Sequence, residues 1–171
     1  INLEDIASPA CFEIEDTLDR ELDIPVFHDD QWGTAVISLS GVINYAHLAG
    51  RELSSLKVVM NGAGAAGIRI CEMLKAAGVE NVTMCDTKGV ISKDRADLNS
   101  FKAKHAVESD AKTLKEALAG ADVFIGVSAP NCVSEEMIKS MNTDAIVFPM
   151  ANPVPEIMTD KAKAAGARVV G

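Results

Sequence analysis

The sequence predicts an α/β protein, built on a doubly wound parallel sheet with helices on both faces. From residue 57 onward, short and continuously apolar runs alternate with segments of helical periodicity. Such runs are typical of parallel strands buried on both faces, because an exposed face would require alternating polar residues. A glycine-rich turn separates the first of these runs from the helix after it. We therefore expect the sheet in residues 51–171 and a helical segment in residues 1–50.

The segment in front of the sheet is expected to contain two helices. Residues 9–22 carry apolar side chains at helical spacing, behind a proline that suits a first helical turn. Residues 23–27 are expected to be extended, since a proline disfavours helix for the residue before it. A largely apolar helix follows over 33–49 and stops at Gly50. Its buried stripe is predicted to consist of Val36, Leu39, Ile43 and Ala46.

The sheet region divides into strands and helices by the same periodicity criteria. We predict strands at 57–61, 82–86, 123–127, 145–149 and 168–170. We predict helices at 65–77, 99–107, 112–119, 135–141 and 159–165. Because parallel strands need crossover connections, these helices are expected to lie on the two faces of the sheet.

Composition and charge argue against several classes of partner. The 171 residues are 48% hydrophobic and 24% charged, which suits one domain of ordinary size. The formal net charge is −9, whereas nucleic acids and anionic membranes attract clustered Lys and Arg. No apolar run in the sequence approaches the roughly 18 residues of a membrane helix. The four cysteines form no C-x-x-C pair, so we expect reduced thiols in a cytoplasmic protein rather than disulfides or zinc.

The glycine-rich turn carries a dinucleotide-binding pattern. Gly62, Gly64 and Gly67 are spaced as G-x-G-x-x-G, and Asp86 ends the next predicted strand, 19 residues after the third glycine. In the Rossmann fold the first glycine forms the tight turn, the second admits the pyrophosphate, and the third lets helix and strand pack closely. The free N–H groups of the helix N-terminus bind phosphate oxygens. The sheet is therefore expected to be Rossmann-like and to bind NAD or NADP.

Two residues bear on the choice between the two cofactors. Asp86 can accept hydrogen bonds from the adenosine ribose and would repel a 2′-phosphate, which slightly favours NAD. Lys88 could pair with that phosphate, which favours NADP. Ser128 follows the predicted strand 123–127, at the end where Rossmann loops contact the cofactor, and is a further candidate. The lysines between residues 102 and 115 are interpreted as a solvated face.

Two pairs of adjacent acids are candidates for a metal site. Glu4 and Asp5 lie near the start, and Asp29 and Asp30 follow a short extended segment. Acids of this kind are more often solvated residues of loops. Asp30, however, stands at the end of an element, where α/β proteins form ligand-binding crevices. Carboxylate oxygens with no cysteine nearby suit Mg²⁺ or Mn²⁺ rather than zinc.

Taken together, these residues resemble the malic enzyme family, and most of all its shorter bacterial type. The similar segments are INLEDI at 1–6, PVFHDDQ at 25–31 with GTA at 33–35, NGAGAAG at 61–67, CDTKG at 85–89 and ANP at 151–153. The resemblance covers essentially the whole chain, and the first two segments are more specific than the glycine motif. It implies the NAD(P)-binding domain of such an enzyme, without the catalytic N-terminal domain.

The resemblance also implies roles for single residues. Glu4, Asp5 and Asp30 match three carboxylate ligands of a divalent metal. Asn152 matches an Asn near the nicotinamide and the substrate, and Thr34 is expected beside the cofactor. The backbone that contacts the cofactor pyrophosphate corresponds to Ala63, Gly64, Ala65 and Ala66.

The reaction implied by the resemblance is the oxidative decarboxylation of L-malate to pyruvate and CO₂, with hydride transfer to NAD or NADP and assistance from the metal. The family's general-base Lys and general-acid Tyr precede residue 1, and Tyr45, the one tyrosine here, is expected in the core. This chain is therefore expected to bind cofactor without turning over malate by itself. Asp29 looks like a neighbour of the metal site rather than a ligand. Trp32 stands where similar bacterial sequences usually have His. Either the Trp is tolerated there as packing at a helix start, or it alters the cofactor side of the cleft.

Three alternatives stay open. A malolactic enzyme would use the same site to make lactate while retaining NAD. A non-catalytic NAD-binding module, or another Rossmann dehydrogenase such as an amino-acid dehydrogenase, would need no metal site. The expected partners are a small-molecule substrate, malate or pyruvate, and further copies of the intact protein in a homo-oligomer.

Overall fold

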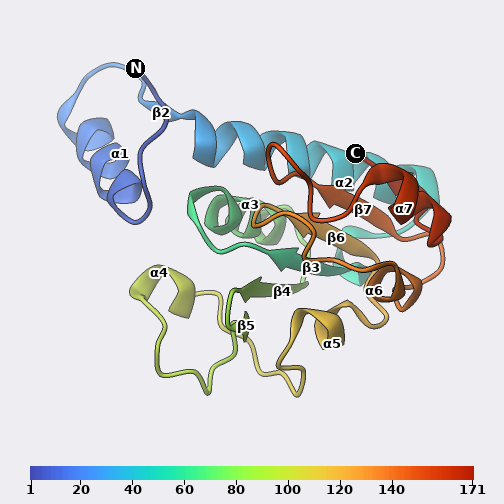
Figure 1. Ribbon diagram of the computed structural model, residues 1–171. Helices are drawn as coiled ribbons and strands as arrows, with labels where there is room; N and C mark the ends of the chain where they lie inside the picture. The colour runs from blue at the N-terminus through green and yellow to red at the C-terminus, as the bar shows by residue number, and fades with distance from the viewer.

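A sheet of six strands lies at the centre of the protein, as the computed structural model of residues 1–171 shows (Figure 1). The strands are β3 (Lys57–Asn61), β4 (Asn81–Asp86), β5 (Gly89–Val90), β6 (Val123–Gly126), β7 (Ile146–Pro149) and β8 (Val169–Val170). Their order across the sheet is β5-β4-β3-β6-β7-β8, and every neighbouring pair is parallel except β4 and β5. The five predicted strands are present. The edge strand β5 was not predicted, because its two residues are too few to show periodicity.

Helices cover both faces of this sheet. They are α1 (Ala10–Glu21), α2 (Thr34–Ala49), α3 (Ala65–Ala76), α4 (Ser100–Ala103), α5 (Leu114–Leu118), α6 (Glu135–Lys139) and α7 (Thr159–Ala164). In β3, Val58 and Met60 join the apolar cluster of α1, α2 and α3, whereas Val59 joins the cluster of α5, α6 and α7. A strand buried on both sides needs a continuous apolar run, and the predicted doubly wound α/β class is confirmed. None of the helices combines the length and the apolar character that crossing a bilayer requires.

Helix α2 presents a different face to the sheet from the one predicted. Val36 and Ile43 are 52% and 43% exposed, so this part of the predicted stripe is wrong. A side-chain carbon at Gly41 would meet the ring of Phe148 at 2.8 Å, which shows how closely the helix approaches the sheet. The face with Gly41 and Ser38 therefore lies toward the sheet, and in a helix with apolar residues on every side periodicity cannot identify that face. The buried side chains are Ala35, Ser38, Val42, Tyr45 and Ala46.

The first 33 residues add a small parallel pair of strands and a turn. These elements are β1 (Asn2–Leu3), β2 (Phe27–His28) and a π-helical turn at Asp29–Gly33 that leads into α2. Trp32 Nε1 donates to Glu15 Oε1 at 2.6 Å, and the Arg69 guanidinium lies 4.5 Å from the centre of the Trp32 ring. Trp32 thus packs α1 against α3. Of the two explanations for a Trp where similar bacterial sequences usually have His, this position favours tolerated packing.

The strand order reverses between β3 and β6, which makes this the topological switch point of the sheet. From β3 the chain crosses to β4 on one side, and from β6 it continues to β7 and β8 on the other. In sheets of this kind, ligands bind in the crevice outside the carboxyl ends of the two strands. The glycine turn follows β3, and the loop that contains Ser128 follows β6.

Candidate cofactor-binding site

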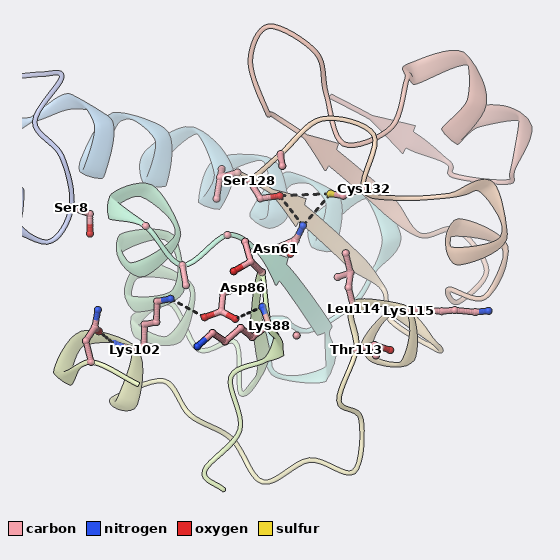
Figure 2. Close-up of a pocket in the computed structure, with 18 of the residues that line it drawn as sticks. Ser8, Asn61, Asp86, Lys88, Lys102, Thr113, Leu114, Lys115, Ser128 and Cys132 are labelled. Atoms are coloured by element: carbon pink, nitrogen blue, oxygen red, sulfur yellow. Dashed lines mark hydrogen bonds and ion pairs between the residues drawn. The ribbon is translucent and has the colours of Figure 1, made fainter. Parts of the chain in front are cut away.

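A cleft of about 920 Å³ opens at the carboxyl ends of β3, β4 and β6 (Figure 2). Its walls come from the glycine turn, from the residues that follow β4, and from the loop after β6. Its lining includes Gly62, Gly64, Asp86, Lys102 and Ser128. Clefts of this size and position are those in which α/β proteins bind cofactors.

The glycine turn leaves no room for side chains at two of its three glycines. Gly62 has φ +119°, and a side-chain carbon there would lie 2.5 Å from the Val127 carbonyl oxygen. A side-chain carbon at Gly67 would collide with the carbonyl oxygen of Gly62. Gly64 differs, because a side-chain carbon there would meet nothing within 4 Å. Gly62 and Gly67 thus allow α3 to approach β3 and β6, whereas Gly64 borders open space.

The N-terminus of α3 points its free amides at the cleft. Gly64 is the N-cap of this helix, and no side chain caps it. The N–H groups of Ala65, Ala66 and Gly67 have no acceptor within the chain. Unpaired amides and the helix dipole together favour a negatively charged group at this end of a helix. The turn is therefore suited to a phosphate of a dinucleotide.

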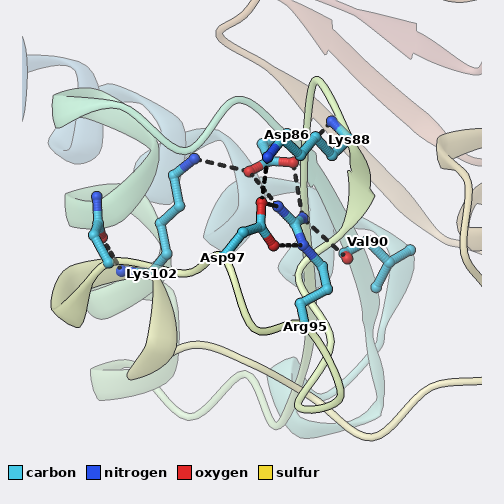
Figure 3. A network of polar contacts seen from close by, with 7 residues as sticks. Asp86, Lys88, Val90, Arg95, Asp97 and Lys102 are labelled. Atoms are coloured by element: carbon cyan, nitrogen blue, oxygen red, sulfur yellow. Dashed lines mark hydrogen bonds and ion pairs between the residues drawn. The ribbon is translucent and has the colours of Figure 1, made fainter.

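Asp86 is not a free carboxylate. Arg95 binds it in a bidentate pair, with Nη1 at 2.8 Å from Oδ1 and Nη2 at 3.1 Å from Oδ2, and Lys102 Nζ lies 2.7 Å from Oδ2 (Figure 3). The Asp86 side chain is only 9% exposed. Burial alone would raise the pKa of this carboxyl, but the hydrogen bonds from Arg95 and Lys102 outweigh burial and lower the pKa of Asp86 to about 2. Asp86 is therefore ionised, with its charge already compensated.

Asp86 belongs to a cluster of three cations and two carboxylates, of which Asp86, Lys88 and Lys102 line the cleft. Lys88 Nζ lies 2.7 Å from Asp97 Oδ2, and Arg95 Nη2 lies 2.9 Å from the same oxygen. With Lys102, the cluster holds three positive and two negative side chains, so one positive charge is left over. The interpretation of Lys102 as part of a solvated face is wrong, because its side chain is 26% exposed and lines the cleft. Sequence reasoning missed Arg95, since it follows an irregular segment in which spacing carries no signal.

Ser128 belongs to a hydrogen-bonded group on the opposite wall (Figure 2). Asn61 Nδ2 donates to Ser128 Oγ at 2.7 Å, and the Ser128 hydroxyl donates to Glu156 Oε1 at 3.2 Å. Cys132 Sγ lies 3.7 Å from the same hydroxyl. Ser128 is exposed to the cleft, whereas Glu156 is fully buried behind it. Glu156 was not a candidate from sequence, because a single acid outside a recognised motif carries no signal.

The predicted cofactor residues do not all lie in the cleft. The first turn of α3 comes directly after Gly64, the last residue of the glycine turn that lines the cleft; it contains Ala65, Ala66 and Gly67. Thr34 begins α2, and Asn152 is exposed in the loop after β7; neither lines the cleft. The predicted residues that do line it are Gly62, Ala63, Gly64, Asp86 and Ser128.

Of the three predicted metal ligands, the structure brings Asp5 and Asp30 into contact but not Glu4. The β1–β2 pairing places the residues after Leu3 beside those after His28, and the Asp5 amide donates to Asp30 Oδ2 at 2.8 Å. Glu4 and Asp5 are exposed. No three His, Cys, Asp or Glu side chains converge into a metal-binding group in this structure. His28 is fully buried, and neither of its ring nitrogens has a hydrogen-bond partner.

The chain is similar in sequence and in structure to known malic enzymes. A family model of the malic enzyme NAD-binding domain matches residues 32–167. The chain is 54% identical to an NADP-dependent malic enzyme of Rhizobium meliloti, over 94% of this chain and 22% of that protein. It is 51% identical to a bifunctional malic/malolactic enzyme of Bacillus subtilis, over 100% of this chain and 43% of that protein. The crystal structure of an NAD-dependent malic enzyme from Thermotoga maritima superposes with a TM-score of 0.96 at 43% identity, over 100% of this chain and 47% of that one.

The matched region contains the cleft except for Ser8 and Pro9 at its edge. Residues 32–167 include the glycine turn, the cluster around Asp86 and the loop of Ser128. The chain spans less than half the length of each of these three relatives. It belongs to the malic enzyme family, as an NAD-binding domain of that family.

Proposed function

We propose that the intact protein is an NAD(P)-dependent malic enzyme and that this chain binds its dinucleotide. The main support is the cleft at the switch point, where the first turn of α3 offers amides without acceptors to a phosphate. The proposed reaction is the oxidative decarboxylation of L-malate to pyruvate and CO₂. A dinucleotide held at the glycine turn would supply the redox chemistry, as the acceptor of the hydride that malate gives up at C2. The names of the relatives support malate as the substrate.

This chain by itself is not expected to turn over malate. Tyr45 lies in the core, only 7% exposed, and its hydroxyl donates to the Asp144 carbonyl oxygen at 3.1 Å. Of the lysines that line the cleft, Lys88 and Lys102 are engaged in ion pairs, whereas Lys115 is in none. Because the family resemblance places the general-base Lys and the general-acid Tyr before residue 1, we assign both to the remainder of the intact protein.

We assign the divalent metal, Mg²⁺ or Mn²⁺, to Glu4, Asp5 and Asp30. Their oxygen donors suit these hard cations, and Asp5 already contacts Asp30 through its amide. The three carboxylates do not meet in this structure, so binding requires the exposed Glu4 and Asp5 side chains to turn toward Asp30. When bound, such an ion supplies Lewis-acid stabilisation of negative charge on a substrate oxygen.

The proposal is tested by titrating the intact protein with NADH and NADPH while following dihydronicotinamide fluorescence. Saturable binding, together with malate-dependent reduction of NAD or NADP and formation of pyruvate, is the expected result. A folded protein that binds neither cofactor would contradict the assignment. Binding without malate oxidation in the presence of Mn²⁺ would favour a non-catalytic NAD-binding module.

Lys102→Ala is expected to discriminate between the two cofactors. The excess positive charge around Asp86 supports acceptance of a 2′-phosphate, although Asp86 alone slightly favours NAD. Loss of one charge-assisted contact should raise the dissociation constant for NADPH about 10-fold, with a change of about 2-fold or less for NADH. The two fluorescence titrations measure this difference directly.

Lys104→Ala is the matched control, because Lys104 is exposed on the same segment and does not line the cleft. It should leave both dissociation constants unchanged. Equal weakening of NADH and NADPH in Lys102→Ala would show that Lys102 acts only by holding Asp86, and would remove its proposed phosphate contact.

A malolactic activity is the second candidate, favoured by the name of the Bacillus subtilis relative, a bifunctional malic/malolactic enzyme. Product analysis of the intact protein separates the two, since lactate would form from malate without net reduction of NAD. Cytoplasmic location and homo-oligomer formation stay predictions for the intact protein.

A further inference from the structure

Glu156 is a fully buried carboxylate that no cation neutralises. Its side chain is 0% exposed, and it takes part in none of the ion pairs of the chain. It lies in the loop between β7 and α7, 28 residues from Ser128 along the chain. Buried charge without a cation is costly, unless several hydrogen bonds satisfy its oxygens. The hydrogen bonds that its two oxygens accept therefore explain how this carboxylate can be buried.

The oxygens of Glu156 join two loops. Oε1 accepts from the Ser128 amide at 2.8 Å and from the Ser128 hydroxyl at 3.2 Å, and Oε2 accepts from the Ala151 amide at 3.0 Å. Backbone bonds add to this connection, because the Asn131 amide donates to the Pro155 carbonyl and the Val133 amide to that of Glu156. The loop after β6 and the loop after β7 are thus joined by at least four hydrogen bonds.

Gly126 provides the space in which the carboxylate lies. A side-chain carbon at this last residue of β6 would lie 2.6 Å from Glu156 Oε1 and 2.7 Å from Oε2. Any larger residue at 126 would therefore displace the carboxylate from the Ser128 amide. Gly126 and Glu156 are an interlocking pair at the switch-point end of the sheet.

The hydrogen bonds also fix the direction of the Ser128 hydroxyl. A serine hydroxyl has one proton to donate and two lone pairs to accept with. Here the proton goes to Glu156, and one lone pair is used by Asn61 Nδ2. Cys132 Sγ, at 3.7 Å, is a weak neighbour by comparison. The second acceptor position of Ser128 has no donor nearer than the Cys132 thiol, and the Ser128 side chain is exposed in the cleft that it lines.

We propose that Glu156 is a positioning residue for cofactor binding, which turns the Ser128 proton away from the cleft. Ser128 then meets the cofactor only as an acceptor. The cofactor groups that fit are donors on the nicotinamide side, a ribose hydroxyl or a carboxamide N–H. This inference depends on the proposed cofactor function, and it adds Glu156 and Gly126 to the residues that determine affinity.

Glu156→Gln in the intact protein is the direct test. An amide at 156 has one acceptor oxygen where the carboxylate has two, so its NH₂ must face either the Ala151 amide or the Ser128 amide, and in the second case the Ser128 hydroxyl loses the acceptor for its proton. We expect the dissociation constant for NADH to rise about 10-fold, as for loss of one charge-assisted hydrogen bond. Glu136→Gln, an exposed acid on α6, is the control and should bind NADH normally.

Introducing Glu156→Gln into the Ser128→Ala variant distinguishes action through the Ser128 hydroxyl from a purely structural role of Glu156. If Glu156 acts through the Ser128 hydroxyl, Glu156→Gln should weaken NADH binding little further once that hydroxyl is absent. Additive weakening in the double variant would overturn the proposal. So would unchanged affinity in Glu156→Gln, provided that the unchanged protein binds NADH; absence of binding by the unchanged protein would instead defeat the proposed function.

A second comparison decides the matter if Glu156→Gln does not fold. Ser128→Ala should weaken NADH binding about 10-fold, and Ser128→Thr, which keeps the hydroxyl, should restore it. Equal affinity of Ser128→Ala and the unchanged protein would show that the cofactor does not use this hydroxyl, and the proposal would fail.

Discussion

Gly64→Val is expected to weaken binding of NADH and NADPH by at least about 100-fold, because two or more charge-assisted hydrogen bonds to phosphate are lost. The valine carbons would stand in the open space beside the free amides of Ala65 and Ala66. A pyrophosphate could then no longer reach these amides. Fluorescence titration with both cofactors measures the loss.

This substitution should leave the fold intact, which makes the result interpretable. Gly64 has φ −88° and ψ −160°, a conformation open to any residue, and a side-chain carbon there meets nothing within 4 Å. The poorer N-cap should cost about 1 kcal/mol or less, and thermal unfolding checks that value. Ala76→Val, which adds two methyl groups at the exposed far end of α3, is the control and should bind normally. Normal affinity of Gly64→Val would disprove phosphate binding at this turn.

Asp30→Ala is expected to reduce malate oxidation by the intact protein by more than about 100-fold. Removing a residue that only contacts a metal ligand already lowers metal affinity or activity about 10- to 100-fold, and removing a ligand itself should lower them further. Binding of NADH should stay within about 2-fold of normal, because Asp30 does not line the cofactor cleft. Mn²⁺ binding, followed by electron paramagnetic resonance, should weaken in parallel with activity. Loss of activity with unchanged Mn²⁺ affinity would contradict the metal assignment.

Two companion variants separate the metal from local structure. Asp30→Asn keeps an oxygen that can accept from the Asp5 amide, now at 2.8 Å from Asp30 Oδ2, yet it removes the charge. It should therefore retain the β1–β2 pairing while losing Mn²⁺ affinity. Asp29→Asn changes the neighbouring acid, which we do not assign as a ligand, and should keep most of both activity and Mn²⁺ binding.

The layout of the fold could be predicted from sequence because it depends on short-range properties. Continuous apolar runs predicted the five parallel strands, and the spacing of Gly62, Gly64 and Gly67 predicted the turn at the carboxyl end of β3. Gly50, predicted to end α2, is its C-cap with φ +62°. These features need only the residues of one element or turn, so neighbouring positions carry the whole signal.

The inward face of α2 could not be predicted, because the helix is apolar nearly all round. What selects its face is the close approach of Gly41 to Phe148 on β7, a contact between residues more than 100 positions apart. For the predicted metal site, by contrast, the grouping of residues came from the family resemblance and not from a local pattern in the sequence. The resemblance grouped Glu4, Asp5 and Asp30, and the structure brings Asp5 to Asp30 without gathering all three.

The sequence alone therefore determined the α/β class, the succession of the five parallel strands and the helices between them along the chain, the glycine turn, and the membership in the malic enzyme family that the comparisons confirm. Only the tertiary structure decided how the cleft is charged and oriented: Arg95 and Lys102 compensate Asp86, and Glu156 fits against Gly126 to hold Ser128. The physical reason is the range of the interactions. Backbone conformation and burial leave a local pattern in the chain, whereas a hydrogen bond between distant loops depends on the path of everything between them.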